Sequence, residues 1–242
     1  MLAQRSQTAV LLFSLPAALD AVRKGLTGKR VARDQALWET MRLLNTAKVI
    51  AAGLDCVSSL DIVPTPDYSA PFGHQLQVAI TATLSLGYQR VIVIGNDCPD
   101  LRVSDLRAAT TELMQGTLPV GYDQRGGVFL FGVDKRFLSI GSINTTTSFE
   151  ALPWQSSQLG TALTSYLNQA FGTVVCLSAV RADWNERADV QGGDWLRGAF
   201  AGLAHQVWML ITTVSGGVTV VTNSIPLFFG RALSLRAPPV AH

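Results

Sequence analysis

Apolar residues fall along this chain in two alternating patterns: short unbroken runs, and longer stretches in which they recur every three or four positions. The unbroken runs predict buried strands over residues 8–15, 90–94, 126–133 and 173–178. The spaced patterns predict helices over residues 33–51, 73–87, 104–114 and 156–171. Strands that alternate with helices form a mostly parallel sheet with helices on both faces. The sequence therefore predicts an α/β fold with a doubly wound, mostly parallel sheet.

The most hydrophobic strand candidate ends in acid, in the stretch RVIVIGNDCPDL. Asp97 and Asp100 follow the run at residues 90–94. In open α/β sheets, ligands bind beyond the carboxyl ends of the strands, where a carboxylate can hold Mg²⁺ or Mn²⁺ and the phosphates of a nucleotide. The residues support another interpretation equally well, in which Asn96, Asp97 and Asp100 form a turn that caps the next helix.

Composition limits the class of protein. The 242 residues suit one α/β domain, alone or with an appendage, and 48% are hydrophobic while 15% are charged. The net charge is +2, and no basic stripe with interleaved aromatic residues occurs, so nucleic acid is not an expected partner. The three cysteines are far apart and none forms a CxxC pair, which favours reduced thiols and a cytoplasmic protein.

Motifs of other enzyme classes do not occur in the sequence. No GxGxxG follows the first strand, no GxxxxGK[ST] is found, and no His/Cys cluster has zinc spacing. Cys98 adjoins Asp97, whose charge raises a thiol pKa, so a nucleophilic cysteine is not expected. His74 precedes a helix without a Ser or Cys partner nearby in sequence and is interpreted as a helix-end residue.

Several segments, taken in order, resemble one family. VIVIGNDCPDLRVSDLRAA is similar to the IGSDCPDL segment of the DUF2064 family, RGGVFLFGV to its DGGYYLIGL strand, LPWQSSQL to its PWGTSRVL turn and DVQGGDWL to its closing DVDTPEDL stretch. FGHQLQVAITATLSLGY resembles the helix before the first of these, and PAALDAVRKGL more loosely its phosphate loop. The resemblance spans roughly residues 8–196. It implies a glycosyltransferase-like protein with a nucleotide-diphospho-sugar transferase fold of the GT-A type.

The resemblance implies roles for residues at the carboxyl edge of the sheet. Asp97 becomes the catalytic and metal-ligating acid, holding Mg²⁺ or Mn²⁺. Arg23 and Lys24, at the end of the loop after the first strand, lie over the same crevice and neutralise a diphosphate. The alternative for this basic pair is a solvated helix face.

The resemblance also implies a sugar subsite. Gly126 and Gly127 let the backbone approach the sugar, and Trp154 with Ser156 and Ser157 forms a wall of the sugar or acceptor site. The alternatives are a plain turn before a strand for the glycines, and a half-buried tryptophan at a helix N-cap.

Two departures from the family pattern bear on the metal. Arg125 stands where the family has an acid before the paired glycines, and Gln191 where its closing motif has a second acid, although Asp189 and Asp194 remain. Losing two carboxylates weakens a site for Mg²⁺ or Mn²⁺. Arg125 is then a catalytic candidate that holds a phosphate or sugar carboxylate directly, and Asp123 is either a replacement acid or a turn residue.

The expected function is that of a nucleotide-sugar-dependent glycosyltransferase acting on an acceptor that the sequence does not identify. Two alternatives remain open. A nucleotidyltransferase would use the same crevice for attack on an α-phosphate, and a degenerate, non-catalytic protein would bind nucleotides without turnover.

The end of the chain differs in composition from the rest. Residues 198–230 contain no Asp, Glu, Lys or Arg. We therefore expect a transferase domain over residues 1–200 and a hydrophobic C-terminal extension over residues 201–242. Residues 209–222 predict two short β runs about a turn at 215–217. The extension is expected to pack on the domain or on a second copy in a homodimer, and membrane association through residues 198–230 is the alternative.

Overall fold

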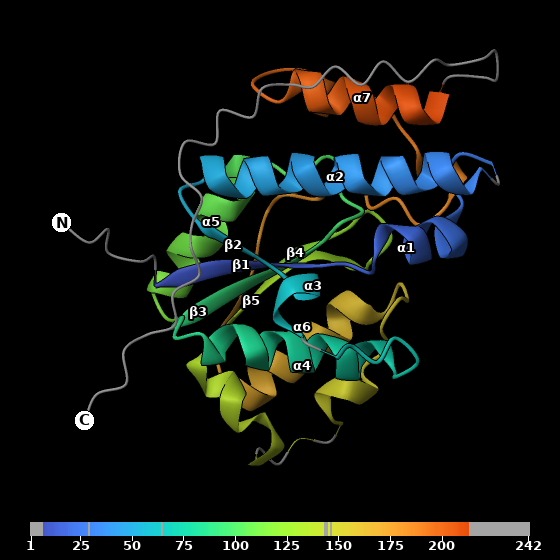
Figure 1. Cartoon of the computed structure of the whole chain (residues 1–242). Helices are drawn as coiled ribbons and strands as arrows, with labels where there is room; N and C mark the ends of the chain where they lie inside the picture. Colours follow the sequence, from blue (N-terminus) through green and yellow to red (C-terminus); the bar gives the residue numbers. More distant parts are fainter. Residues whose placement is uncertain (1–6, 29, 64, 143–144, 146, 213–242) are drawn as a thin grey trace, which may run out of the picture.

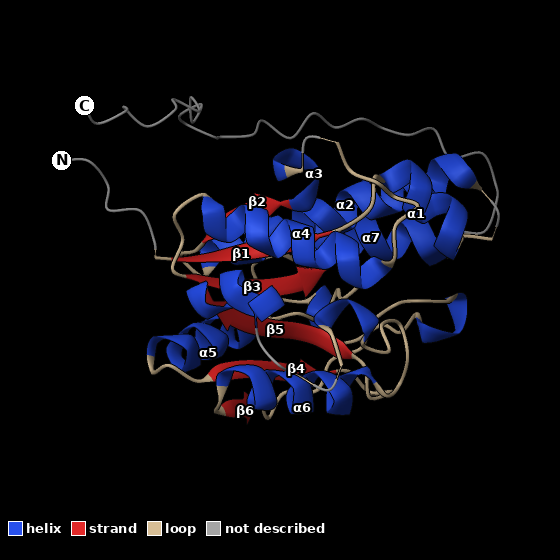
Figure 2. Ribbon diagram, turned by 90° about the horizontal axis from the view of Figure 1, so that it is seen from below, coloured by secondary structure: helices blue, strands red, loops and turns tan. Residues whose placement is uncertain are grey.

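A six-stranded sheet forms the middle layer of the molecule, with helices on both faces (Figure 1). The computed structural model describes residues 7–212 except 29, 64, 143, 144 and 146. The strands are β1 (Thr8–Phe13), β2 (Asp55–Ser58), β3 (Arg90–Gly95), β4 (Leu118–Tyr122), β5 (Val128–Asp134) and β6 (Val174–Cys176). Their order is β2-β1-β3-β5-β4-β6 (Figure 2). Strand β5 runs antiparallel to β3 and β4, while the other pairs are parallel, which confirms the mostly parallel α/β sheet.

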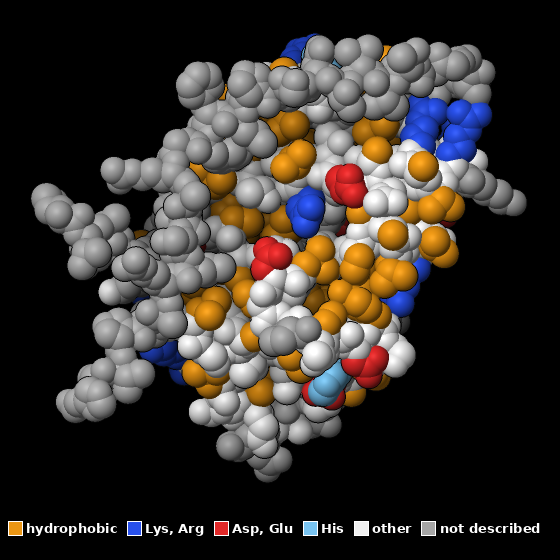
Figure 3. Space-filling view, viewed as in Figure 1, with side chains coloured by type: hydrophobic (Ala, Val, Ile, Leu, Met, Phe, Trp, Pro, Cys, Tyr) orange, Lys and Arg blue, Asp and Glu red, His pale blue; other side chains and the backbone are white. Residues whose placement is uncertain are grey.

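The helices divide between the two faces of the sheet. They are α1 (Ala17–Lys24), α2 (Val31–Ala51), α3 (Ser59–Ile62), α4 (Phe72–Ser85), α5 (Val103–Met114), α6 (Leu159–Phe171) and α7 (Ala201–Thr212). Short 3₁₀ turns are η1 (Lys135–Ser142), η2 (Phe149–Ala151), η3 (Arg187–Asp189) and η4 (Asp194–Leu196). Helices α2 and α5 cover one face and α4 and α6 the other (Figure 1). Few charged side chains appear on the face seen in Figure 3, as the composition leads one to expect.

The helices expected from the spaced apolar pattern correspond to α2, α4, α5 and α6, each within three residues at either end. The segment after β1, expected as a loop, is instead helix α1. Its sequence AALDAVRK is rich in helix formers, with acid in the first turn and Arg23 and Lys24 in the last, an arrangement that complements the helix dipole. Strands β2 and β4 were not predicted, because neither contains a long apolar run. In β4, Pro119 and Gly121 separate the apolar residues.

The beginning of the C-terminal extension packs on the domain as a helix. Residues Met209–Thr212, expected to be β, form the last turn of α7, and the predicted turn at residues 215–217 lies outside the described part of the chain. Val207 and Ile211 join a buried cluster with Leu37 and Met41 of α2, so burial on one helix face overrides β propensity. Within the described residues, no helix is long and apolar enough to cross a membrane.

Candidate functional site

A cleft of about 810 Å³ opens at the carboxyl ends of β1 and β3. Its two ends differ in character. Charged side chains of α1, of the loop after β3 and of the segment after β6 line one end, and Phe72 and Trp154 line the other. Such a cavity lies where doubly wound sheets bind ligands.

An ion pair occupies the charged end of the cleft. The Nζ atom of Lys24, in the last turn of α1, lies 2.6 Å from Oδ2 of Asp97, two residues beyond the end of β3. The ammonium also donates to Oδ1 of Asn185 at 3.3 Å and lies 5.2 Å from the ring centre of Trp38. Both partners of the ion pair keep 23% of their side-chain surface exposed, so a ligand can reach them.

Two further carboxyl groups lie at this end of the cleft. Burial raises the pKa of Asp20 to about 6, and the charge of Asp97 adds to the increase. Burial and the charges of Asp97 and Asp123 hold the pKa of Asp183 well above its usual value. Its Oδ1 atom is buried with no hydrogen-bond partner among the residues that the structure describes. Burial alone lowers the pKa of Lys24, but the charge and hydrogen bond of Asp97 outweigh it and raise the pKa above 10.5.

Backbone contacts place the segment after β6 beneath the loop after β3. We call this loop, residues 96–102, the acidic loop. The N–H of Trp184 donates to the carbonyl of Asp97 at 2.8 Å, which brings Asp183 and Asn185 beside Lys24. The indole of Trp184 is fully buried in the cluster formed by α1, α2 and α7. The positions of the two side chains are thus set by the core.

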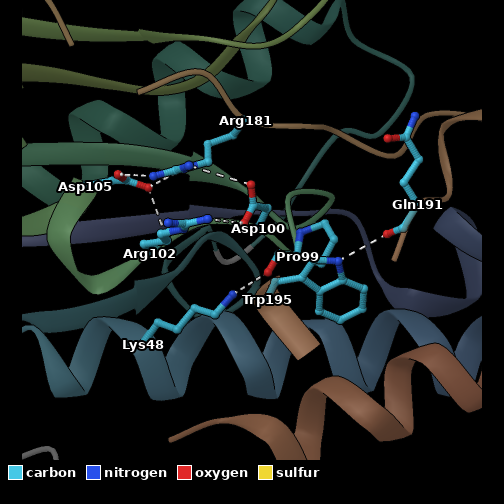
Figure 4. A network of polar contacts seen from close by, with 8 residues as sticks. All are labelled: Lys48, Pro99, Asp100, Arg102, Asp105, Arg181, Gln191 and Trp195. Carbon is cyan, nitrogen blue, oxygen red and sulfur yellow. Dashed lines mark hydrogen bonds and ion pairs between the residues drawn. The ribbon is translucent and has the colours of Figure 1, made fainter. Parts of the chain in front are cut away.

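Two cations fix the acidic loop from its other side, as Figure 4 shows. Arg181 makes a bidentate contact with Asp105, both N–O distances being 2.7 Å. Asp105 also accepts from the N–H of Arg102 at the start of α5. Buried Lys48 donates to the carbonyl of Pro99 at 2.6 Å. Burial lowers the pKa of this lysine to about 8, since its hydrogen-bond acceptor is neutral.

Arg125 is held at the rim of the cleft by Asp189, with 2.9 Å between Nη1 and Oδ1. The other oxygen of Asp189 accepts from the N–H groups of Asn185 and Glu186. Asp123 accepts from the N–H groups of Arg125 and Gly127, both at 2.7 Å. In this structure Asp123 therefore stabilises the turn before β5.

The paired glycines are required by the packing of the chain itself. Gly126 has φ 87°, a left-handed conformation that disfavours other residues. A Cβ atom there would strike the carbonyl of Ser157, and one at Gly127 would strike the carboxylate of Asp123. Gly127 lines the cleft, so its backbone also faces any ligand bound there.

Aromatic rings build the other end of the cleft. The Trp154 ring lies 5.6 Å from that of Phe72 and 4.9 Å from that of Phe149, and its Nε1 donates to the carbonyl of Phe149. Ser156 donates to the carbonyl of Pro153 and accepts from a backbone N–H. Both Trp154 and Ser156 line the cleft, although their polar groups donate hydrogen bonds to nearby backbone carbonyls.

Residues 43–156 match the DUF2064 family model. The model is described as an uncharacterized protein conserved in bacteria, and the match confirms the resemblance. No curated protein matches the chain.

Solved structures share the fold. A candidate nucleotide-diphospho-sugar transferase from Desulfovibrio desulfuricans G20 aligns with a TM-score of 0.61 and 16% identity, over 85% of this chain and 97% of that one. Rv0371c of Mycobacterium tuberculosis H37Rv aligns at 0.44 and 15%, over 77% and 96%. Glucosyl-3-phosphoglycerate synthase of Mycobacterium tuberculosis, in complex with Mn²⁺, UDP and glucosyl-3-phosphoglycerate, aligns at 0.40 and 14%, over 86% and 79%. The first of these supports a transferase-like fold of the GT-A type.

The structure brings most of the candidates named from the DUF2064 resemblance to one cleft. Those that line it are Arg23, Lys24, Asp97, Asp123, Arg125, Gly127, Trp154, Ser156 and Ser157, while Gly126 does not line it. The lining residues that were not singled out from the sequence include Asp20, Asp183 and Asn185 at the charged end. Asp183 and Asn185 have the two-residue spacing that opens DVDTPEDL, which the resemblance placed at Asp189 and Gln191. That spacing, soon after β6, is the signal that could have located them.

The residues at the charged end do not fit a divalent cation as they stand. Within the described residues, no group of three or more His, Cys, Asp or Glu side chains could hold a metal ion. Mg²⁺ and Mn²⁺ prefer several anionic oxygens. Here Asp97 is paired with an ammonium, and Asn185 supplies a neutral oxygen.

Proposed function

We propose that this protein binds a nucleoside-diphosphate sugar in the cleft and transfers the sugar to an acceptor. The observation that carries the proposal is the Lys24–Asp97 pair, which places a cation at the carboxyl edge of β3 inside a cavity of nucleotide size. The family match and the transferase-like fold agree with it.

In this proposal the diphosphate lies at the charged end of the cleft. As the bond from the anomeric carbon to the phosphate oxygen breaks, its electron pair stays on the leaving nucleoside diphosphate. The ammonium of Lys24 can stabilise that charge, with Arg23 beside it on α1. The acceptor oxygen forms the new bond to the anomeric carbon, and its hydroxyl releases a proton.

The remaining candidate residues have two proposed roles: some contact the sugar or acceptor, and Arg125 acts at the rim of the cleft. The backbone at Gly127 and the side chains of Trp154 and Ser156 would contact the sugar or acceptor, because they line the end away from Lys24. Arg125 would hold a phosphate or carboxylate by exchanging its contact with Asp189. None of these roles requires a divalent cation.

A calorimetric screen of the full chain tests the proposal. UDP, GDP, ADP and dTDP sugars, and the corresponding triphosphates, are titrated first in EDTA and then with Mn²⁺. We expect at least one diphosphate sugar to bind, and Lys24→Met to weaken it at least about tenfold, the value of one charge-assisted hydrogen bond. Lys135→Met, on exposed η1 away from the cleft, is the matched control and should not change affinity.

Other results of the screen would contradict the proposal in different ways. Preference for a triphosphate with Mg²⁺ would favour a nucleotidyltransferase. Binding of a diphosphate sugar with neither transfer nor hydrolysis, across a panel of acceptors, would favour a non-catalytic binding protein. If no nucleotide bound in either condition, the cleft would have another ligand.

A further inference from the structure

The charged end of the cleft already contains a cation that belongs to the chain. Nζ of Lys24 lies 2.6 Å from Asp97, 3.3 Å from Asn185 and 5.2 Å from the Trp38 ring centre. The charges of Asp20 and Asp183 also act on it. A compact ammonium with three donors suits such a ring of oxygens. Lys24 thus is the cation that these oxygens and acids hold at the charged end of the cleft.

Two other carboxylates near the cleft, those of Asp123 and Asp189, already accept hydrogen bonds from other groups. Asp123 accepts from two backbone N–H groups of its own turn. Asp189 accepts from two more and from Arg125. Without these two, a divalent ion would have to share Asp97 with the ammonium, and two cations a few ångströms apart repel strongly in a partly buried site.

The ammonium is held in place by the fold. Helix α1 ends at Lys24, and Gly25 turns the chain away with φ 51°. The aromatic face of Trp38, buried in α2, lies against the ammonium. The contact between Trp184 and the backbone of Asp97 fixes the segment that carries Asn185. Elements far apart in sequence therefore converge on this lysine.

We propose that Lys24 is the resident cation of the cleft, and that it does the work of a divalent metal ion by binding the diphosphate directly. The inference rests on the proposed function and deepens it, because it makes nucleotide binding independent of metal. On binding, a phosphate oxygen takes the place of the Asp97 carboxylate at the ammonium.

Mn²⁺ alone provides a test that needs no nucleotide. Electron paramagnetic resonance measures free Mn²⁺ in titrations of the wild type, Lys24→Ala and the control Lys135→Ala. We expect Lys24→Ala to bind Mn²⁺ at least tenfold more tightly than the wild type and the control, since the carboxylate of Asp97 is then released from its ion pair and the competing positive charge is gone. Equal affinity in all three proteins would overturn the inference, whether the shared affinity is high or low.

Nucleotide binding provides the second test, using UDP-glucose or whichever diphosphate sugar the calorimetric screen selects. The wild type should bind it equally, within twofold, in EDTA and in Mn²⁺, whereas Lys24→Ala should bind weakly in EDTA and recover at least tenfold with Mn²⁺. Lys24→Gln serves as a second variant if Lys24→Ala does not give a folded circular dichroism spectrum. A wild type that binds only with Mn²⁺ would overturn this inference and leave the proposed function intact. If no nucleotide binds at all, the proposed function fails, and the Mn²⁺ titration still decides whether Lys24 occupies a cation site.

Discussion

The two sides of the acidic loop use lysine in opposite ways. On the cleft side, Lys24 faces the carboxylate of Asp97 and its pKa is raised. On the core side, Lys48 faces the neutral carbonyl of Pro99, and burial lowers its pKa to about 8. The same residue type is thus a charged group open to a ligand on one side, and a buried hydrogen-bond donor on the other.

The comparison distinguishes charged groups that stabilise the fold from charged groups that are available to bind a ligand. On the core side, Arg181 and Asp105 satisfy each other with two short contacts and little exposure. On the cleft side, three carboxyl groups surround one ammonium, and Asp183 keeps a buried oxygen with no partner in the described residues. Groups left in excess of their partners are typical of a site that a ligand completes.

The largest expected effect is on the core side. Arg181→Met should reduce the free energy of unfolding by about 3–5 kcal/mol, because it leaves the buried carboxylate of Asp105 without its cationic partner. Urea denaturation monitored by tryptophan fluorescence measures the loss. Arg102→Met is the control, since Arg102 is half exposed and lies 3.6 Å from Asp100, and it should cost less than about 1 kcal/mol. Similar small losses in both variants would remove the distinction between the two sides.

The second prediction concerns pH and Lys48. Between pH 8 and 10.5 the folded protein has largely released the proton of Lys48, while the unfolded chain keeps it. Because the unfolded state then binds more protons, the contribution of Lys48 to stability rises with pH in this window. The stability difference between the wild type and Lys48→Met should therefore shift by about 2–3 kcal/mol in favour of the wild type from pH 7 to pH 10. Urea titrations at each pH measure it, with Lys135→Met as the variant expected to show no such shift.

The contribution of Lys24 to stability should change with pH in the opposite direction. Its raised pKa means that its stabilising contribution is complete below its unfolded value near 10.5 and is lost only as the pH rises through the folded value. If Lys48→Met and Lys24→Met gave pH dependences of the same sign, the two lysines would not differ in the way their partners indicate.

The sequence predicted the layered sheet well because burial imposes periodicity. Long helices such as α2 and α4 and the apolar run of β3 were located from spacing alone. Short elements carry fewer positions and were missed: β2 has four residues, and α1 has an apolar pattern too brief to separate from a loop. In α7, packing on α2 decided between helix and strand, and that information is not local.

Site residues were predicted from the sequence where they directly follow a long hydrophobic strand. They were missed where only tertiary contacts bring them to the cleft. Asp97 stood out because acid ends the most hydrophobic run. Asp183 and Asn185 follow β6, which is three residues long and partly exposed, so their only local signal is the two-residue spacing shared with DVDTPEDL, which the resemblance placed at Asp189 and Gln191. Asp20 lies on a helix that was not foreseen. The pairing of Arg125 with Asp189 joins a departure from the family pattern to an acid that its closing motif retains, and the two positions appear unrelated in the sequence.

The smallest expected effect separates the two roles that Asp97 can have. If Asp97 were a ligand to Mn²⁺, Asp97→Asn would weaken metal-dependent nucleotide binding at least about tenfold. With Lys24 as the resident cation, the carboxylate of Asp97 competes with the phosphates for the ammonium. Neutralising it should then leave affinity in EDTA unchanged or raise it, by no more than about tenfold, or 1.4 kcal/mol. Asp100→Asn changes the same charge in the same loop, but Asp100 faces Arg102 and Arg181, so nucleotide affinity should stay constant. Calorimetry on both variants in EDTA and in Mn²⁺ measures the difference, and weaker binding in Mn²⁺ by Asp97→Asn alone would return Asp97 to the role of a metal-ligating acid.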